Sequence, residues 1–198
     1  MKFFKDMVKF HGHACPGLAF GFRVSEVALQ HLGARSLDEE LVAVVENRSC
    51  AVDAIQVMTG CTIGKGNLII NDYGKQVYTF LKRPEGKGVR IAVKWVGPPE
   101  SPESREMWKR FGRGDRSKEV MRVIKTRKGQ KMQSILKADP NELFEIRATN
   151  ETLPERAKVY SSVRCAICGE KVMKPKITQL AGNMLCIPCA EKKAGQFV

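Results

Sequence analysis

Phe10-His11-Gly12-His13-Ala14-Cys15-Pro16-Gly17 is the stretch that organises the chain, because it holds two of the three histidines and one of the seven cysteines. If residues 11–15 run extended, His11, His13 and Cys15 occupy alternate positions and point to one face. Two imidazoles and one thiolate form a donor set for a borderline metal ion. The alternative is structural, since a cysteine often packs as a small apolar group. Reactive side chains at alternate positions directly before a helix favour a metal site or a catalytic site.

The apolar run from Leu18 to Leu32 predicts a helix with Pro16 at its first position and Cys15 at its N-cap. Proline suits the first position because its missing N–H would have no partner there. The positive end of the helix dipole favours the thiolate form of a cysteine at the N-cap. Cys15 is therefore a candidate nucleophile as well as a candidate metal ligand.

The composition indicates a globular protein of one or two domains, with 198 residues of which 43% are apolar. No apolar run approaches the length of a membrane span, and residues 1–6 lack the apolar segment of a signal peptide. We therefore expect a cytoplasmic protein with no membrane partner. An odd number of cysteines, four of them in a metal-type spacing, favours reduced thiols over a disulfide framework.

The formal net charge of +13 raises the question of an anionic partner. Residues 105–131 hold eleven lysines and arginines against three acidic residues, a net charge of +8. Such a run is more often the solvated face of a helix, so nucleic acid is the less favoured partner and stays open as an alternative. An anionic cofactor or an acidic protein would be attracted by the same field.

A second helix is predicted over residues 51–58, where apolar side chains recur at helical spacing. Cys50 lies at or near its N-terminus, Asp53 falls in its first turn, and Gly60 closes it directly before Cys61. The glycine-rich loop 60–67 could hold an anionic group through Lys65 and Asn67, although the full P-loop spacing is absent. The alternative is a plain connection into the next strand.

The remaining pattern predicts an α+β fold, with a mixed or antiparallel sheet packed with helices. Residues 41–46 predict a strand that is buried on both faces. Turn residues separate the next three strands and imply antiparallel hairpins, and three prolines between residues 98 and 102 then break the pattern. The predicted later elements are strands at 68–72, 76–81, 89–95 and 143–147, and helices at 102–110 and 118–136. The first domain is expected to cover residues 1–149.

The most specific signal in the chain is Cys165-x2-Cys168-x17-Cys186-x2-Cys189. This spacing is typical of structural zinc, and four thiolates leave no open coordination position. We expect a linker over residues 150–162, followed by a treble-clef or zinc-ribbon-like domain over residues 163–198 with a short helix near Pro188. So small a segment cannot bury enough surface to fold alone, so bound zinc would supply the missing stability.

Residues 10–19, 50–56, 59–68 and 72–75 together resemble the FmdE family of formylmethanofuran dehydrogenase components. That family is named for its association with the tungsten or molybdenum enzyme that reduces carbon dioxide onto methanofuran, and some members carry a C-terminal zinc-binding module. The resemblance implies an α+β core that forms a homodimer. It also implies a cleft lined by His11, His13, Cys15, Cys50, Asp53 and Cys61.

Within that cleft, chemistry ranks His13 and Cys15 first as ligands of a second metal, zinc, nickel or iron, followed by Cys61 and Cys50 and then His11. Asp53 would orient a histidine or act as a general base. In a metal-free cleft, Cys15 would be the nucleophile and His13 its base.

The expected function is that of a metalloprotein in molybdenum- or tungsten-dependent one-carbon redox metabolism, either as an accessory component of the dehydrogenase or as an enzyme. The alternatives are a metal-handling or metal-sensing protein without catalysis, and a nucleic-acid-binding zinc protein.

Overall fold

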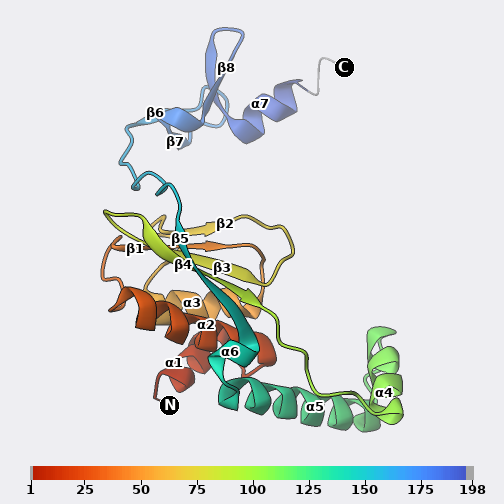
Figure 1. Ribbon diagram of the computed structural model, residues 1–198. Coiled ribbons are helices and arrows are strands. Elements are labelled where there is room, and N and C mark those ends of the chain that lie inside the picture. The colour runs from red at the N-terminus through yellow and green to blue at the C-terminus, as the bar shows by residue number, and fades with distance from the viewer. Residues whose placement is uncertain (1, 195–198) are drawn as a thin grey trace. The chain divides into compact units, whose positions relative to one another are not determined.

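The computed structural model describes residues 2–194 and divides the chain into two compact units, Met1–Arg156 and Ala157–Val198 (Figure 1). The sequence predicted a core over residues 1–149, a linker over residues 150–162 and a zinc domain over residues 163–198. The last four residues of that predicted zinc domain lie outside the described part of the chain. Each unit has its own apolar cluster of buried side chains.

The first unit is built on a sheet of five strands in the order β2-β1-β3-β4-β5. β1 pairs in parallel with β2, and every other neighbouring pair is antiparallel. β1 is buried on both faces, as its continuous apolar sequence predicted. The mixed sheet with its helices confirms the predicted α+β class. The strands are β1 (Leu41–Val45), β2 (Leu68–Ile70), β3 (Val77–Lys82), β4 (Lys87–Val93) and β5 (Phe144–Asn150).

One predicted strand pairing is wrong. Turn residues at 72–75 suggested a hairpin between the second and third strands, but β2 lies parallel to β1, with Val44 opposite Ile69. The reason is the helix between β1 and β2, since a parallel strand can be reached only by a crossover connection. β3 then takes the other side of β1, and the hairpin that follows it, β3 to β4, forms as predicted.

Three helices pack together in the first unit, α1 (Lys2–His11), α2 (Pro16–Leu32) and α3 (Cys50–Thr59) (Figure 1). α2 and α3 confirm the two helices that the sequence predicted, with Cys15 at the N-cap of α2 and Gly60 at the C-cap of α3. Gly60 adopts a φ of +75°, a left-handed conformation that glycine accepts readily.

The sequence analysis missed α1, and its assumption that residues 11–15 run extended is wrong. α1 forms because Phe4, Met7 and Val8 recur at helical spacing and pack toward Phe22 and its neighbours. Met7 is fully buried, and the rings of Phe4 and Phe22 meet edge to face at 5.6 Å. His11 is therefore the last residue of a helix rather than the first residue of a strand.

α2 and α3 approach each other closely because glycines on α2 face α3. A Cβ atom at Gly21 would lie 2.3 Å from the carbonyl oxygen of Ala51, and one at Gly17 would lie 3.0 Å from the Cβ of Cys50. Any side chain at Gly21 would therefore push the two helices apart. This contact holds the N-terminus of α2 beside the N-terminus of α3.

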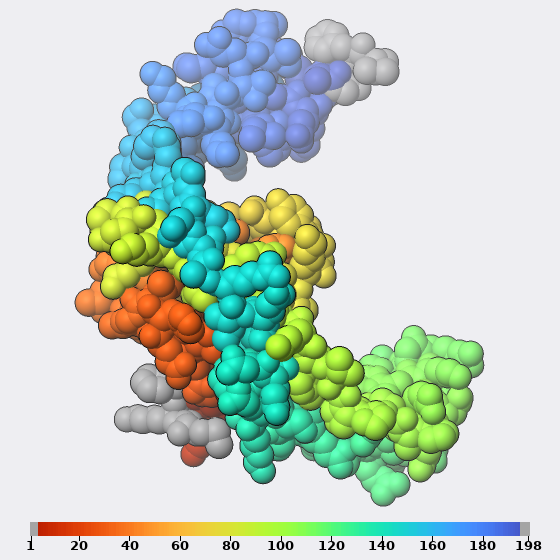
Figure 2. Space-filling model, in the orientation of Figure 1, coloured from red at the N-terminus to blue at the C-terminus, as the bar shows by residue number. Residues whose placement is uncertain are grey.

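The basic segment forms a helical hairpin, α4 (Pro102–Gly112) and α5 (Lys118–Lys137), which confirms both predicted helices. The C-terminal half of α5 packs on α2, and α4 lies at the other end of α5, away from the sheet (Figures 1 and 2). Met107, Val120 and Ile124 are buried between the two helices. The short helix α6 (Pro140–Leu143) then leads into β5.

The second unit consists of two small hairpins and one helix. A small apolar cluster with Leu185 at its centre lies between them. α7 begins beside Pro188, where the sequence predicted a short helix. No helix within residues 2–194 has the length and apolar character to span a membrane. The elements are β6 (Ser162–Arg164), β7 (Lys171–Met173), the 3-10 turn η1 (Lys174–Lys176), β8 (Ile177–Leu180), β9 (Asn183–Cys186) and α7 (Ile187–Ala194).

Candidate metal centres

Three helices bring one donor each to a single point in the first unit. His11 is the last residue of α1, Cys15 is the N-cap of α2 and Cys50 is the first residue of α3. Their ligand atoms all lie within 4.8 Å of one another, and all three residues are partly exposed. The cluster therefore has the spacing of a metal site and remains accessible from outside.

Asp53, one turn further along α3 than Cys50, fixes the orientation of the His11 ring. The Nδ1 atom of His11 lies 2.7 Å from the Asp53 carboxylate, and its Nε2 atom lies 3.9 Å from the Cys15 sulfur. Because the carboxylate accepts a hydrogen bond from the Nδ1–H, the lone pair of Nε2 points toward the thiols. A carboxylate in this position is typical of metal-binding histidines and also of histidine bases.

The two thiols of this cluster have different surroundings. The Cys15 sulfur accepts a hydrogen bond from the backbone N–H of Leu18 at 3.4 Å, as an N-cap side chain does. Burial raises the pKa of the Cys50 thiol, and its interaction with Cys15 raises it further. A bound cation would offset this penalty, because it stabilises both thiolates together.

His13 and Cys61, the other donors predicted for this cleft, are not among the three clustered ligands. His13 is exposed, and its ring centre lies 4.5 Å from that of His11. Cys61 is fully buried in the apolar core and donates from its sulfur to the carbonyl oxygen of Leu41. The structure thus brings together His11, Cys15 and Cys50 and keeps Cys61 apart from them.

Lys65 and Asn67 were predicted to hold an anionic group. Their side chains instead make hydrogen bonds that link the loop 60–67 to residues 37–41. The Lys65 ammonium donates to the carbonyl oxygens of Leu37 and Asp38. Asn67 is 2% exposed, donates to the carbonyl oxygens of Asp38 and Leu41, and accepts from the N–H of Thr62. Their polar groups are therefore occupied within the loops.

The second cluster lies in the second unit, where the sulfur atoms of Cys165, Cys168, Cys186 and Cys189 lie within 4.8 Å of one another. The Cys186 N–H donates to the Cys165 sulfur at 3.3 Å, and this and further backbone N–H groups lower the pKa of Cys165 to about 6. Neighbouring thiols, Cys186 first, raise the pKa of Cys189 to about 12. Four sulfurs gathered in this way can hold a metal ion such as zinc.

The fold and the two clusters define a small α+β protein of the metal-binding class, with one cluster built across three helices and the other within a knuckle-like module. Comparison with protein families assigns it more closely. The family model described as "FmdE, Molybdenum formylmethanofuran dehydrogenase operon" matches residues 10–145. The chain therefore belongs to the FmdE family, which confirms the resemblance of its motifs to that family.

The chain is also similar to one curated protein in sequence and to one solved structure in fold. The chain is 34% identical over 194 residues to a "Probable S-adenosyl-L-methionine-binding protein" of Archaeoglobus fulgidus. The match covers 92% of this chain and 50% of that protein. The chain therefore spans about half the length of the curated relative it matches. A crystal structure of a tungsten formylmethanofuran dehydrogenase FmdE-like protein from Syntrophus aciditrophicus superposes with a TM-score of 0.62 at 21% identity. It covers 96% of this chain and 91% of that one, which shows a shared fold.

Proposed function

We propose that His11, Cys15 and Cys50 bind one metal ion with an open coordination position, and that this ion is the reactive centre of the protein. The observation that carries the proposal is the convergence of these three donors within 4.8 Å, with the His11 ring held by Asp53. One imidazole and two thiolates match the ligand set of catalytic zinc sites that keep a fourth position for water or substrate. Zinc suits this set best, and nickel and iron also accept it.

In this proposal His11, Cys15 and Cys50 bind the metal, and Asp53 positions the His11 ring. Cys15 and Cys50 supply negative charge, and His11 supplies a neutral ligand whose direction Asp53 sets. A metal held in this way would polarise a carbonyl group or lower the pKa of bound water. His13, exposed beside His11, is placed to exchange protons with a bound substrate. For the four-cysteine cluster we propose structural zinc, because a site with four thiolates has no position left for substrate.

Metal content of the full chain, purified without added metal, tests the proposal. The wild type should carry two ions per chain, one for each cluster. Cys50→Ala should carry one, because it removes a ligand from the first cluster only. Cys61→Ala is the matched control, since Cys61 is a core cysteine of the same unit outside the cluster, and it should keep both ions. A wild type with a single ion, even after incubation with zinc, nickel or ferrous iron, would refute the metal site.

The same geometry favours one other function. Cys15, His11 and Asp53 are arranged in the order nucleophile, base and orienting carboxylate, as in thiol-dependent catalysis. If the first cluster holds no metal, we expect Cys15 to react rapidly with iodoacetamide and His11→Gln to slow that reaction. In this alternative the base is His11, and not His13 as predicted from the sequence.

For partners, we propose a homodimer that serves a molybdenum- or tungsten-dependent one-carbon dehydrogenase. The support for the dehydrogenase is the description of the family, and the support for the dimer is β5, which pairs with β4 alone among the described strands. Sedimentation at micromolar concentration should report the dimer.

A further inference from the structure

A groove of about 750 Å³ runs along one side of α5. Its lining residues on α5 fall between Lys118 and Met132, which corresponds to about 21 Å of helix. Phe111 of α4 and Ala14, from the loop before α2, complete the lining. The groove therefore belongs wholly to the first unit and connects the helical hairpin with the stretch that carries Cys15.

The floor of this groove is apolar and adaptable. It is formed by Met121, Met132, Ile124 and Phe111, and Met121 is 42% exposed. Methionine side chains adjust to differently shaped ligands. A Cβ atom added at Gly129 would meet nothing within 4 Å, so this glycine leaves open space along the helix. The floor offers an extended apolar surface to a ligand.

The rim of the groove is cationic. Lys118, Arg122, Lys125 and Lys128 line it, and none of them pairs with a carboxylate of residues 2–194. Two other arginines of the same hairpin are paired with carboxylates. Arg110 bonds to Asp115 and Glu119, and Arg127 bonds to Glu100. Lys118, Arg122 and Lys125 are therefore available to an anionic ligand, and the Lys128 ammonium lies over the rings of Phe111 and Trp108, 5.2 Å and 5.9 Å from their centres.

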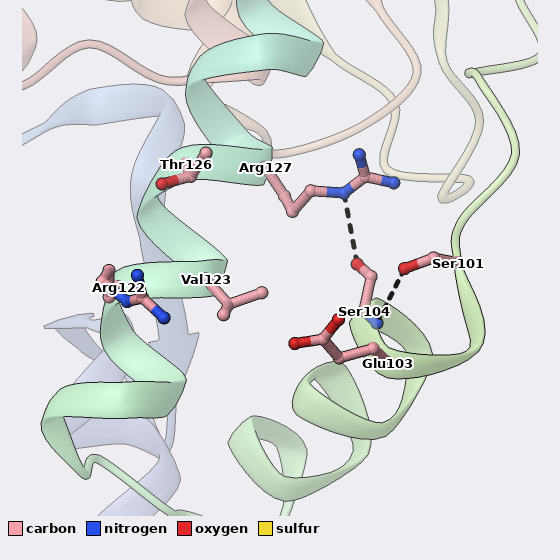
Figure 3. A pocket seen from close by; sticks show the side chains of 7 residues that line it. All are labelled: Ser101, Glu103, Ser104, Arg122, Val123, Thr126 and Arg127. Carbon is pink, nitrogen blue, oxygen red and sulfur yellow. Dashed lines mark hydrogen bonds between the residues drawn. The ribbon is translucent and has the colours of Figure 1, made fainter.

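Contacts on another side of the hairpin hold the groove in shape. Figure 3 shows Arg127 of α5 donating to the Ser104 hydroxyl at 3.2 Å, while the Ser101 hydroxyl accepts from the Ser104 N–H at the start of α4. These bonds, together with the buried contact of Met107 with Val120 and Ile124, fix α4 against α5. Phe111 is thereby held in place before a ligand arrives, which reduces the cost of binding.

We infer that this groove binds an elongated organic anion with an apolar body, and that such a molecule is the substrate of the neighbouring metal centre. The apolar body lies on the methionine floor and the anionic group meets the rim lysines. Ala14, which lines the groove, is the residue directly before the ligand Cys15. A volume of this size is typical of small-molecule sites. The part concerning substrate rests on the proposed function of the His11, Cys15 and Cys50 cluster.

Calorimetric titration of the full chain with decyl phosphate, below its micelle-forming concentration, tests this inference. Decanol and inorganic phosphate are the comparison ligands, because each carries one half of the recognised chemistry. We expect decyl phosphate to bind at least about tenfold more tightly than either, since only it uses both floor and rim. Equal affinities for decanol and decyl phosphate would overturn the role of the cations.

Two variants locate the binding. Lys125→Gln combined with Lys128→Gln should weaken decyl phosphate binding about tenfold or more, because two of the four rim charges are lost. The matched control combines Arg105→Gln with Lys109→Gln, which removes the same charge from α4 outside the groove, and it should bind like the wild type. Gly129→Leu should abolish binding by filling the open space. Unchanged affinity in Gly129→Leu, or an equal loss in the control pair, would overturn the inference.

Metal content and oligomeric state separate this inference from the function it rests on. All groove variants should keep the wild-type metal content, so a failure to bind decyl phosphate with full metal content refutes the groove alone. A wild type that lacks the first ion but binds decyl phosphate refutes the metal centre alone. If Gly129→Leu converts a dimer into a monomer in sedimentation while decyl phosphate fails to bind, the groove is an interface between two copies of the chain and the inference is overturned. Tighter binding of an acidic amphipathic peptide than of decyl phosphate would likewise overturn it.

Discussion

The two cysteine clusters of this protein are assembled in opposite ways. The four-cysteine cluster takes all its donors from two short segments of the second unit, the turn with Cys165 and Cys168 and the junction of β9 and α7 with Cys186 and Cys189. The other cluster takes His11, Cys15 and Cys50 from three different helices of the first unit. The first arrangement is local in sequence, whereas the second exists only after α1, α2 and α3 have packed.

This difference assigns different physical roles to the two clusters. The second unit has a very small apolar centre, so its ligands need a metal to stay together, and the free energy of metal binding becomes free energy of folding. The first unit has a continuous core around Ile55, Tyr78 and Phe80. That core holds the donors in place without help from an ion, so an ion bound there, as we propose, would be free to react.

The largest effect is expected from a substitution that disrupts the four-cysteine cluster alone. Cys168→Ser should remove one ion per chain and unfold residues from about 163 onward, while the thermal transition of the first unit stays largely in place. The reason is that three thiolates hold zinc much less tightly than four in so small a module. Metal content and calorimetry of the full chain measure both effects.

Ile167→Ser is the control for this change, because Ile167 is an exposed side chain between two of the ligands. It should keep the ion and both transitions. If Cys168→Ser also kept its zinc, the cluster would not be the metal site of the second unit.

A smaller effect is expected when the close contact between α2 and α3, which brings Cys15 and Cys50 together, is disrupted. Gly21→Ala places a methyl group against the Ala51 backbone, so α2 and α3 must separate. We expect a loss of roughly 1–3 kcal/mol in the free energy of unfolding of the first unit, as for other overpacked cores. Metal affinity at the first cluster should fall as well, because Cys15 and Cys50 move apart.

Gly112→Ala offers a comparison for Gly21→Ala, since a Cβ at Gly112 meets nothing within 4 Å. It should leave both stability and metal content near the wild-type values. A Gly21→Ala protein with unchanged affinity at the first cluster would show that the helix contact does not position the ligands.

The sequence predicted those parts of the structure that depend on local pattern. The cap at Cys15, the helix beginning at Cys50 and the four-cysteine spacing each follow from neighbouring residues. His11 was predicted as the lowest-ranked ligand of this site, but its position at a helix end did not follow, because it depends on α1, whose repeat of Phe4, Met7 and Val8 was overlooked. That repeat was the available signal, and with it His11 becomes a helix end rather than part of an extended run.

Other features could not be read from neighbouring residues at all. Cys61 has the same residue type as Cys50 and lies directly after the helix that Cys50 begins, yet it is buried in the core. The glycine-rich loop around Lys65 has the composition of an anion site. The Lys65 ammonium nevertheless donates hydrogen bonds to the carbonyl oxygens of Leu37 and Asp38. In the first unit, which donors meet is decided by tertiary packing, and local spacing carries no information about it.

Asp53 provides a test of positioning without removal of a ligand. Asp53→Asn keeps the shape of the side chain but weakens its hold on the Nδ1 proton of His11. We expect metal affinity at the first cluster to fall about 10–100-fold, the usual cost of losing such a partner. The second cluster should keep its ion, which competition titration with a chelator can resolve.

Asp72→Asn is the matched control, because Asp72 is a surface carboxylate of the same unit that pairs with Arg48. It should leave both affinities unchanged. Complete loss of the first ion in Asp53→Asn would instead make Asp53 a direct ligand of the metal.

The smallest expected effect concerns the response of the two units to acid. Glu40 accepts hydrogen bonds from the Ser36 hydroxyl and the Asp38 N–H, and these lower its pKa from the usual value of 4.5 to about 2. Its carboxylate therefore stabilises the first unit above about pH 4.5, and this contribution is lost as the pH falls from there toward 2. Because Glu40 is exposed, solvent screens the effect.

Glu40→Gln should lower the Tm of the first unit by a few degrees at most at pH 7, with the difference from the wild type shrinking as the solution is acidified. The neighbouring Glu39→Gln, whose carboxylate accepts no hydrogen bond from residues 2–194, should show no such trend. The second unit responds to acid through protonation of its thiolates and release of its metal, so its transition should be the same in all three proteins. A pH-independent difference in Glu40→Gln would mean that the loop before β1 is stabilised by the shape of the side chain and not by its charge.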